Sequence, residues 1–185
     1  MAIVVGFQKN VSLNVNAGLP GDLGSARTMV TLAANGLFAL GDVIVGNAGF
    51  YAPSGNQVVS ASADGTTAVA GFVLRNSGLA PMGWTDSQKG YGFIVPDGTQ
   101  ASLGINGDFL AIITGIDANG AANHVPFIGE KIWVKLLDGS IACAPSSVAT
   151  ATGYVATNWI VTKVGLLTQA TVGTNQSFGQ FSGQL

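Results

Sequence analysis

The chain has 185 residues and a mass of 18.6 kDa, which suits one domain with or without arms. Only 9% of the residues are charged, and the net charge is -2 at pH 7. The seven basic residues are scattered, which excludes the basic stripe that a nucleic-acid partner needs. No apolar run approaches the roughly 18 residues that cross a bilayer, so we expect neither nucleic acid nor a membrane as a partner.

Short runs rich in Val, Ile, Thr and aromatic residues recur along the chain and predict β-strands. In the run 131–136, for example, Ile132, Val134 and Leu136 fall on one face, because successive side chains of a strand alternate between faces. In chain order the predicted strands are 2–7, 11–15, 42–45, 58–62, 68–74, 92–95, 101–105, 109–113, 131–136, 153–156 and 160–164.

Turn signals separate several of these runs. Asn-Gly and Asp-Gly pairs tolerate the positive φ that tight hairpins need, and the clearest predicted hairpins lie at Asn106-Gly107 and Asp138-Gly139. A single glutamate and many β-branched residues leave room for one short helical turn, at 146–149. The sequence therefore predicts an all-β sandwich or barrel.

The two ends differ from the middle of the chain. We expect an N-terminal strand or arm segment over 1–28, a β-sandwich domain over 29–167 and a flexible C-terminal arm over 168–185. The last segment is polar and glycine-rich, with Phe178 and Phe181 as isolated apolar residues, so it cannot build a core of its own. It is either a frayed tail or an arm that inserts its two phenylalanines into a neighbouring subunit.

No pattern for catalysis, a cofactor or a metal is present. Cys143 is the only cysteine, which excludes an internal disulfide, and its apolar surroundings predict a small buried side chain. His124 is the only histidine, and no Gly-x-Ser-x-Gly motif presents a nucleophile, so we expect His124 to make ordinary hydrogen bonds in a loop or at a strand edge. We predict a protein that is not an enzyme and has no catalytic, cofactor-binding or metal-binding residues.

The glycine-rich stretch Asn-Ala-Gly-Leu-Pro-Gly-Asp-Leu-Gly-Ser-Ala-Arg, residues 16–27, is not a phosphate-binding loop. It lacks the lysine of such a loop, its glycine spacing and the helix that follows. What remains is an extended segment in which Leu19, Pro20 and Leu23 are apolar and the glycines permit close approach to another surface.

An ordered series of short motifs carries a family resemblance over residues 7–165. The motifs are Gly-Asp-x-x-Ser-Ala at 21–26, Ile-Asn-Gly-Asp-Phe at 105–109, Gly-Glu-Lys-Ile-Trp-Val at 129–134 with Asp-Gly at 138–139, and Gly-Tyr-Val-Ala-Thr-Asn-Trp at 153–159. This order resembles the structural cement, or decoration, proteins of tailed-bacteriophage heads. The chain departs from that family at 21–25, where Gly-Asp-Leu-Gly-Ser replaces the usual Gly-Asp-Phe-Ala-Ser, and in its longer tail after Val164.

The resemblance implies a jelly-roll-like β domain with extended N- and C-terminal arms, on the outer surface of a virion capsid. Such a protein is made in the host bacterial cytoplasm, clamps neighbouring subunits of the major capsid protein and forms a homodimer or homotrimer. The residues that we expect at capsid or subunit interfaces are Phe7, Leu13, Leu19, Pro20, Leu23, Phe178 and Phe181.

Two other functions remain open from the sequence. One is a structural protein of the phage tail, baseplate or fibre, which equally suits low charge and polar ends. The other is a carbohydrate-binding or hydrolytic β-sandwich, whose sugar platform would use Trp84, Trp133 and Trp159 with Tyr51, Tyr91 or Tyr154.

Overall fold

The computed structural model describes residues 20–24, 30–31, 37–53, 56–62, 68–75, 94–166 and 174–184. These residues contain strands and loops but no helix, so the predicted all-β class is confirmed. The strands are β1 (Val30–Thr31), β2 (Phe38–Ala39), β3 (Val43–Ile44), β4 (Ala48–Tyr51), β5 (Gln57–Val59), β6 (Val69–Val73), β7 (Ile94–Val95), β8 (Leu103–Gly115), β9 (Lys131–Lys135), β10 (Ile141–Ala144), β11 (Tyr154–Lys163) and β12 (Gln176–Gln184).

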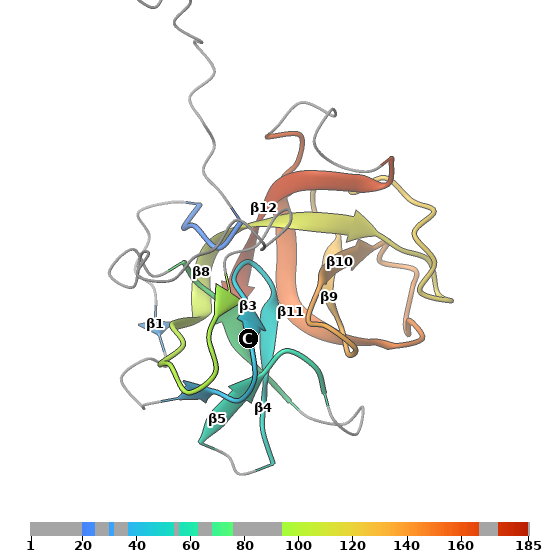
Figure 1. Ribbon diagram of the computed structural model, residues 1–185. Helices are drawn as coiled ribbons and strands as arrows, with labels where there is room; N and C mark the ends of the chain where they lie inside the picture. Colours follow the sequence, from blue (N-terminus) through green and yellow to red (C-terminus); the bar gives the residue numbers. More distant parts are fainter. Residues whose placement is uncertain are drawn as a thin grey trace, which may run out of the picture.

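Five of the strands close into a barrel, in the order β10-β9-β11-β12-β8 (Figure 1). The neighbours in this order are antiparallel, and a parallel pairing of β10 with the end of β8 closes the ring. β12 pairs with β8 over the whole stretch from Asn106 to Thr114. Closure reduces the unpaired strand edges that favour aggregation.

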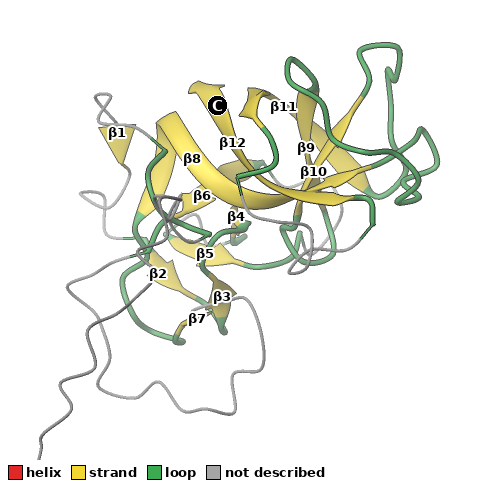
Figure 2. Cartoon of the chain, turned by 90° about the horizontal axis from the view of Figure 1, so that it is seen from above, coloured by secondary structure: helices red, strands yellow, loops and turns green. Residues whose placement is uncertain are grey.

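A smaller sheet continues from the start of β8, through β6, β4, β5 and β2. Figure 2 shows β8 curving across the molecule from this sheet into the barrel. The β9–β10 turn also joins the two parts, because the Ala48 N–H donates to the Gly139 carbonyl (2.8 Å) and the Ser62 N–H to the Leu136 carbonyl (2.8 Å). β3 and β7 form a separate antiparallel pair.

The main core lies where the two parts meet. Phe72 of β6 has its ring centroid 5.2 Å from that of Phe109 on β8 and 5.1 Å from that of Phe181 on β12. Trp159 of β11 completes the cluster, 5.2 Å from Phe181. All four side chains are fully buried, and aromatic pairs at these separations stabilise a core beyond the area they bury.

The structure corrects one predicted hairpin and confirms the other. Strand β8 continues without a break through Asn106-Gly107, because both residues pair with β12 and so form part of a sheet instead of a turn. The predicted strands 153–156 and 160–164 likewise belong to the single strand β11, which has an irregular register between Ala156 and Ile160. At Asp138-Gly139 the hairpin forms as predicted, with Gly139 at φ 71°.

Two further predictions differ from the structure. The segment 146–149 contains no helical turn, and its backbone makes a tight turn in which the Val148 N–H donates to the Pro145 carbonyl (2.9 Å). Residues 176–184, expected in a flexible arm, form the barrel strand β12. The predicted strands 2–7 and 11–15 lie outside the described residues.

Candidate interaction surfaces

The segment Pro20–Gly24 lies along β8 and meets it at an isolated bridge. The Gly21 N–H donates to the Leu110 carbonyl (2.9 Å), the Leu110 N–H donates to the Asp22 carbonyl (3.0 Å), and Leu23 forms an antiparallel bridge with Phe109. This edge of β8 lies between the residues that pair with β6 and those that pair with β10. The segment therefore covers a stretch of strand edge that β12, on the opposite side, cannot reach.

A bidentate ion pair and a glycine contact fasten this segment. Arg75 donates from Nε to Oδ1 of Asp22 (2.7 Å) and from Nη2 to Oδ2 (3.0 Å), and its backbone N–H donates to the Gly21 carbonyl (2.9 Å). Gly21 has a φ of 88°, and a Cβ at this position would lie 2.4 Å from Cγ1 of Val45. The close approach thus requires glycine.

Among the interface candidates from the sequence, Leu23 points outward with 46% of its surface exposed, and Pro20 is half-buried. Phe7, Leu13 and Leu19 lie outside the described residues.

Phe178 and Phe181 differ from the expectation of an arm that reaches a neighbour, because both are fully buried within their own chain. The two residues are three apart, so the two-residue period of strands puts them on opposite faces of β12, and both faces are covered. The register of β12 sets Phe178 beside Ile112 and Phe181 beside Phe109 on β8, at positions where β12 completes the barrel.

A second exposed feature is the apolar end of the loop between β8 and β9. Val125, Phe127 and Ile128 are 53%, 60% and 66% exposed, and Ile160 of β11 is 46% exposed. The loop lies beside β11, because the Gly129 N–H donates to the Val161 carbonyl (2.8 Å). We call these four residues the barrel-end surface.

The buried carboxylate of Glu130 holds this loop in place. Oε1 of Glu130 lies 2.5 Å from Nε2 of His124, and Oε2 accepts from the Phe127 N–H (2.9 Å) and from the Cys143 thiol (3.0 Å). Glu130 and Cys143 are buried, and His124 is half-buried. Glu130 therefore bonds to His124 and Phe127 of the loop and to Cys143 of β10. The sequence alone did not connect these residues.

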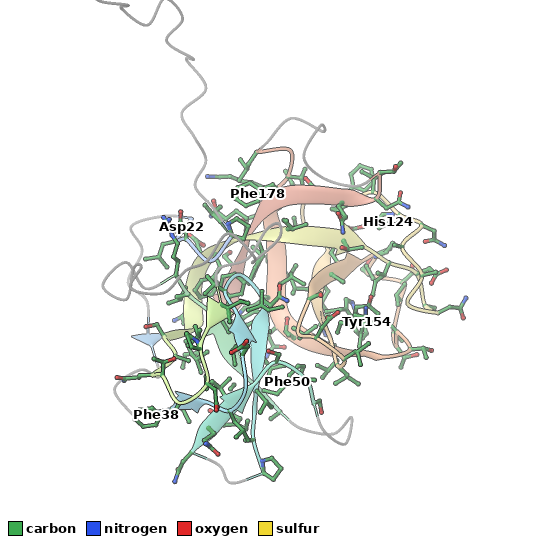
Figure 3. All side chains as sticks on the ribbon, in the orientation of Figure 1. Asp22, Phe38, Phe50, His124, Tyr154 and Phe178 are labelled. Carbon is green, nitrogen blue, oxygen red and sulfur yellow. The ribbon has the colours of Figure 1, made fainter. Side chains whose placement is uncertain are left out.

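A third exposed apolar feature lies at the other end of the molecule. Phe38 of β2 and Leu40 just after it are each 46% exposed, and we call this pair the β2-end surface. Figure 3 places Phe38 and His124, which marks the barrel-end loop, at opposite ends of the molecule. The two surfaces can therefore contact two different partners at once.

The described residues include one histidine, His124, and one cysteine, Cys143. They contain no group of three or more His, Cys, Asp and Glu side chains placed to hold a metal ion. Burial raises the pKa of the Cys143 thiol, and the hydrogen bond to Glu130 raises it further, so this sulfur stays protonated and is a poor nucleophile.

The sugar platform considered from the sequence is not assembled in this part of the chain. Trp133 and Trp159 are 3% and 0% exposed, so neither ring can stack on a ligand. Trp84 and Tyr91 lie outside the described residues. Within the described ranges, no helix has the length and apolar character that a membrane span requires.

A family model described as the XM1 gp53 minor capsid protein matches residues 7–174, nearly the whole chain. The chain belongs to this family. A chain in a solved structure titled "The capsid of Myoviridae Phage XM1" has a similar fold, with a TM-score of 0.52 and 17% identity, over 95% of this chain and 96% of that one. No curated protein matches the sequence. As a member of the XM1 gp53 family, the protein is a structural component of a phage capsid and belongs to the virion.

Proposed function

We propose that this XM1 gp53 family member is a cement protein on the outer surface of the phage head, where it bridges and stabilises subunits of the major capsid protein. Family membership supports the capsid role. A charged fraction of only 9% supports extensive burial against other proteins, because protein interfaces are depleted in charged residues at their centres.

The observation that carries this proposal is the fastened N-terminal segment. Backbone hydrogen bonds to β8 and the Asp22–Arg75 pair fix Pro20–Gly24, yet Leu23 stays 46% exposed. A rigid base that presents an apolar side chain loses little entropy when it binds, so it suits an anchor to the shell. Phe7, Leu13 and Leu19 precede this base, and we propose that they contact the shell with Leu23.

Such an anchor stabilises heads by mass action. A protein that binds only the assembled lattice lowers the free energy of that state, and the gain grows with its concentration relative to Kd. Bridging adds to this effect when one copy holds two capsid subunits, because a local opening of the shell must then break two contacts.

The test is to prepare heads that lack this protein, add back purified chain and measure Kd and the melting temperature of the heads. We expect stoichiometric binding and a higher melting temperature with the wild type. For Leu23→Asp we expect at least about tenfold weaker binding, since a charge then replaces the apolar contact. Leu137→Asp is the matched control, because Leu137 is 73% exposed and lies on the β9–β10 turn, outside the segment.

Two outcomes contradict the proposal. Heads that melt at the same temperature with and without saturating protein exclude cementing. Labelled protein that decorates tails or baseplates in micrographs, and not heads, assigns the chain to those structures instead.

A further inference from the structure

The two exposed apolar surfaces have exposed charged neighbours of opposite sign. The β2-end surface has acidic neighbours, and the barrel-end surface has basic ones. These two surfaces lie at opposite ends of one chain (Figure 3).

The acidic neighbours of the β2-end surface are Asp42 and Asp97. Asp42 is exposed and follows Leu40 by two residues. Asp97 is exposed and its Oδ1 accepts from the Gly41 N–H (2.8 Å), which holds the 96–99 turn against β2. The same turn donates the Gly98 N–H to the Ala39 carbonyl (2.9 Å). Asp42 is therefore close to Leu40 along the chain, and the hydrogen bond holds Asp97 beside Gly41, the residue that follows Leu40.

The basic neighbours of the barrel-end surface are Lys131 and Lys163. Lys131 is exposed and directly opposite Ile160 in the β9–β11 register, so the two side chains share a face. Lys163 is exposed two residues beyond Val161, the residue that bonds to the loop. Neither lysine forms an ion pair with another residue in the described ranges.

In the described ranges, the acids near the barrel-end surface form no ion pair with either lysine. Glu130 is buried and bound to His124. Asp117, at the start of the loop, is half-buried, and its carboxylate accepts from the Asn119 and Ala121 N–H groups and from Asn123. Strands β9, β11 and β12 contain no acidic residue.

We propose that copies of this protein associate head to tail, with the barrel-end surface of one copy on the β2-end surface of the next. Each contact places Phe127, Ile128 and Ile160 against Phe38 and Leu40, inside a rim where lysines face aspartates. Apolar centres with complementary charged rims are the usual anatomy of a specific interface. A contact between two barrel ends, or between two β2 ends, sets like charges against each other.

A head-to-tail contact has a structural consequence. Because it joins different surfaces of two copies, it forms rings when the rotation closes and extended chains when it does not. On a head, it would link neighbouring copies laterally. This inference goes beyond the proposed cement function, because the contact forms between copies of the chain alone.

The test uses two charge-reversed full-length chains in solution. The first carries Lys131→Glu and Lys163→Glu. The second carries Asp42→Lys and Asn56→Lys. This choice keeps the hydrogen bond from the Gly41 N–H to Asp97, and the two new lysines outweigh the charge of Asp97. Asn56 is an exposed residue whose carbonyl accepts from the Phe38 N–H (3.4 Å). Sedimentation equilibrium at about 50 mM and 500 mM salt measures the association constant.

We expect the wild type to associate, more weakly at high salt, and each reversed chain alone to associate at least about tenfold more weakly. An equimolar mixture of the two reversed chains should recover association, since its opposite charges face each other again. Lys135→Glu is the control, because Lys135 lies at the other end of β9 and pairs with Asp138 (3.4 Å). We expect this control to associate like the wild type.

Three results overturn the inference. One is a wild type that stays monomeric up to roughly millimolar concentration, where even weak specific contacts form. The second is reversed chains that associate as strongly as the wild type. The third is a mixture that associates no better than its components. None of these measurements uses heads, so failure here is separate from failure of the cement function.

Discussion

At the scale of single residues, Glu130 is the most consequential polar side chain in the described structure. Its carboxylate satisfies the Phe127 N–H, the Cys143 thiol and His124 while it is only 8% exposed. Removing one member of such a network leaves its partners unsatisfied in a medium of low dielectric constant, which costs more than the bonds themselves contributed.

We therefore expect Glu130→Ala to lower the free energy of unfolding by about 2–3 kcal/mol, and Glu130→Gln by less, because an amide oxygen can still accept from the Phe127 N–H. Urea denaturation followed by tryptophan fluorescence measures both values. Thr150→Ala serves as control, since Thr150 is exposed. Equal stability of wild type and Glu130→Ala would show that solvent satisfies the partners of this carboxylate in the variant.

Cys143 gives a prediction for alkaline pH. Burial, and then Glu130, raise the pKa of the thiol in the folded chain above its ordinary value of about 8.5. Above that pH the unfolded chain releases a proton that the folded chain retains, so the free energy of unfolding falls as pH rises. We expect a loss approaching roughly 1 kcal/mol per pH unit between pH 8.5 and 10 that Cys143→Ala does not show. Urea titrations at several pH values measure it, and parallel curves for the two chains contradict it.

At the scale of secondary-structure elements, β12 shows how a polar sequence can form part of a core. Its glycines and glutamines give a composition typical of a tail, but Phe178 and Phe181 supply one large, fully buried side chain on each face of the strand, and Phe181 joins the main core. The rest of its stabilisation comes from main-chain pairing with β8 and β11, and that pairing is independent of side-chain type.

This strand yields a second stability test. We expect Phe181→Ala to cost about 3–5 kcal/mol, as large core truncations do. A chain ending at residue 173 should show no cooperative transition, because the barrel then lacks a strand. The control is Ile160→Ala on the neighbouring strand, where the side chain is 46% exposed and the cost should stay below about 1 kcal/mol. A truncated chain that unfolds with wild-type stability would make β12 a dispensable arm.

Local sequence signals predicted the elements unevenly, for physical reasons. The hairpin at Asp138-Gly139 was predictable because the turn and its two flanking strands are adjacent in sequence. Asn106-Gly107 carries the same signal, but a distant segment pairs with both residues, and no local pattern reports that pairing. Several strands were therefore readable from the sequence, whereas β12 and the lengths and partners of the strands depended on tertiary contacts.

At the scale of the whole molecule, the candidate surfaces were less predictable than the fold class. Leu23 was identified because glycines and a proline mark its segment. The barrel-end and β2-end surfaces combine residues that are far apart in sequence, such as Ile128 with Ile160, and exposure cannot be read from residue type alone. Their charges become meaningful only when the fold separates the lysines from the aspartates.

The shared aromatic core leads to a final prediction, that the barrel and the smaller sheet unfold together. Phe72 belongs to the smaller sheet, yet its ring contacts Phe109 and Phe181 of the barrel. A substitution there should weaken both parts equally, because neither part keeps a complete core without the other.

For Phe72→Ala we expect the free energy of unfolding to fall by about 3–5 kcal/mol, with the same loss at amides of both parts. Native-state hydrogen exchange at Phe50 in β4 and at Val134 in β9 measures the two losses separately. Leu40→Ala is the control, since Leu40 is 46% exposed and its truncation should change neither value by more than about 0.5 kcal/mol. A loss confined to Phe50 would mean that the barrel folds as an independent unit, and the smaller sheet would then be an appendage held by β8 and the β9–β10 turn.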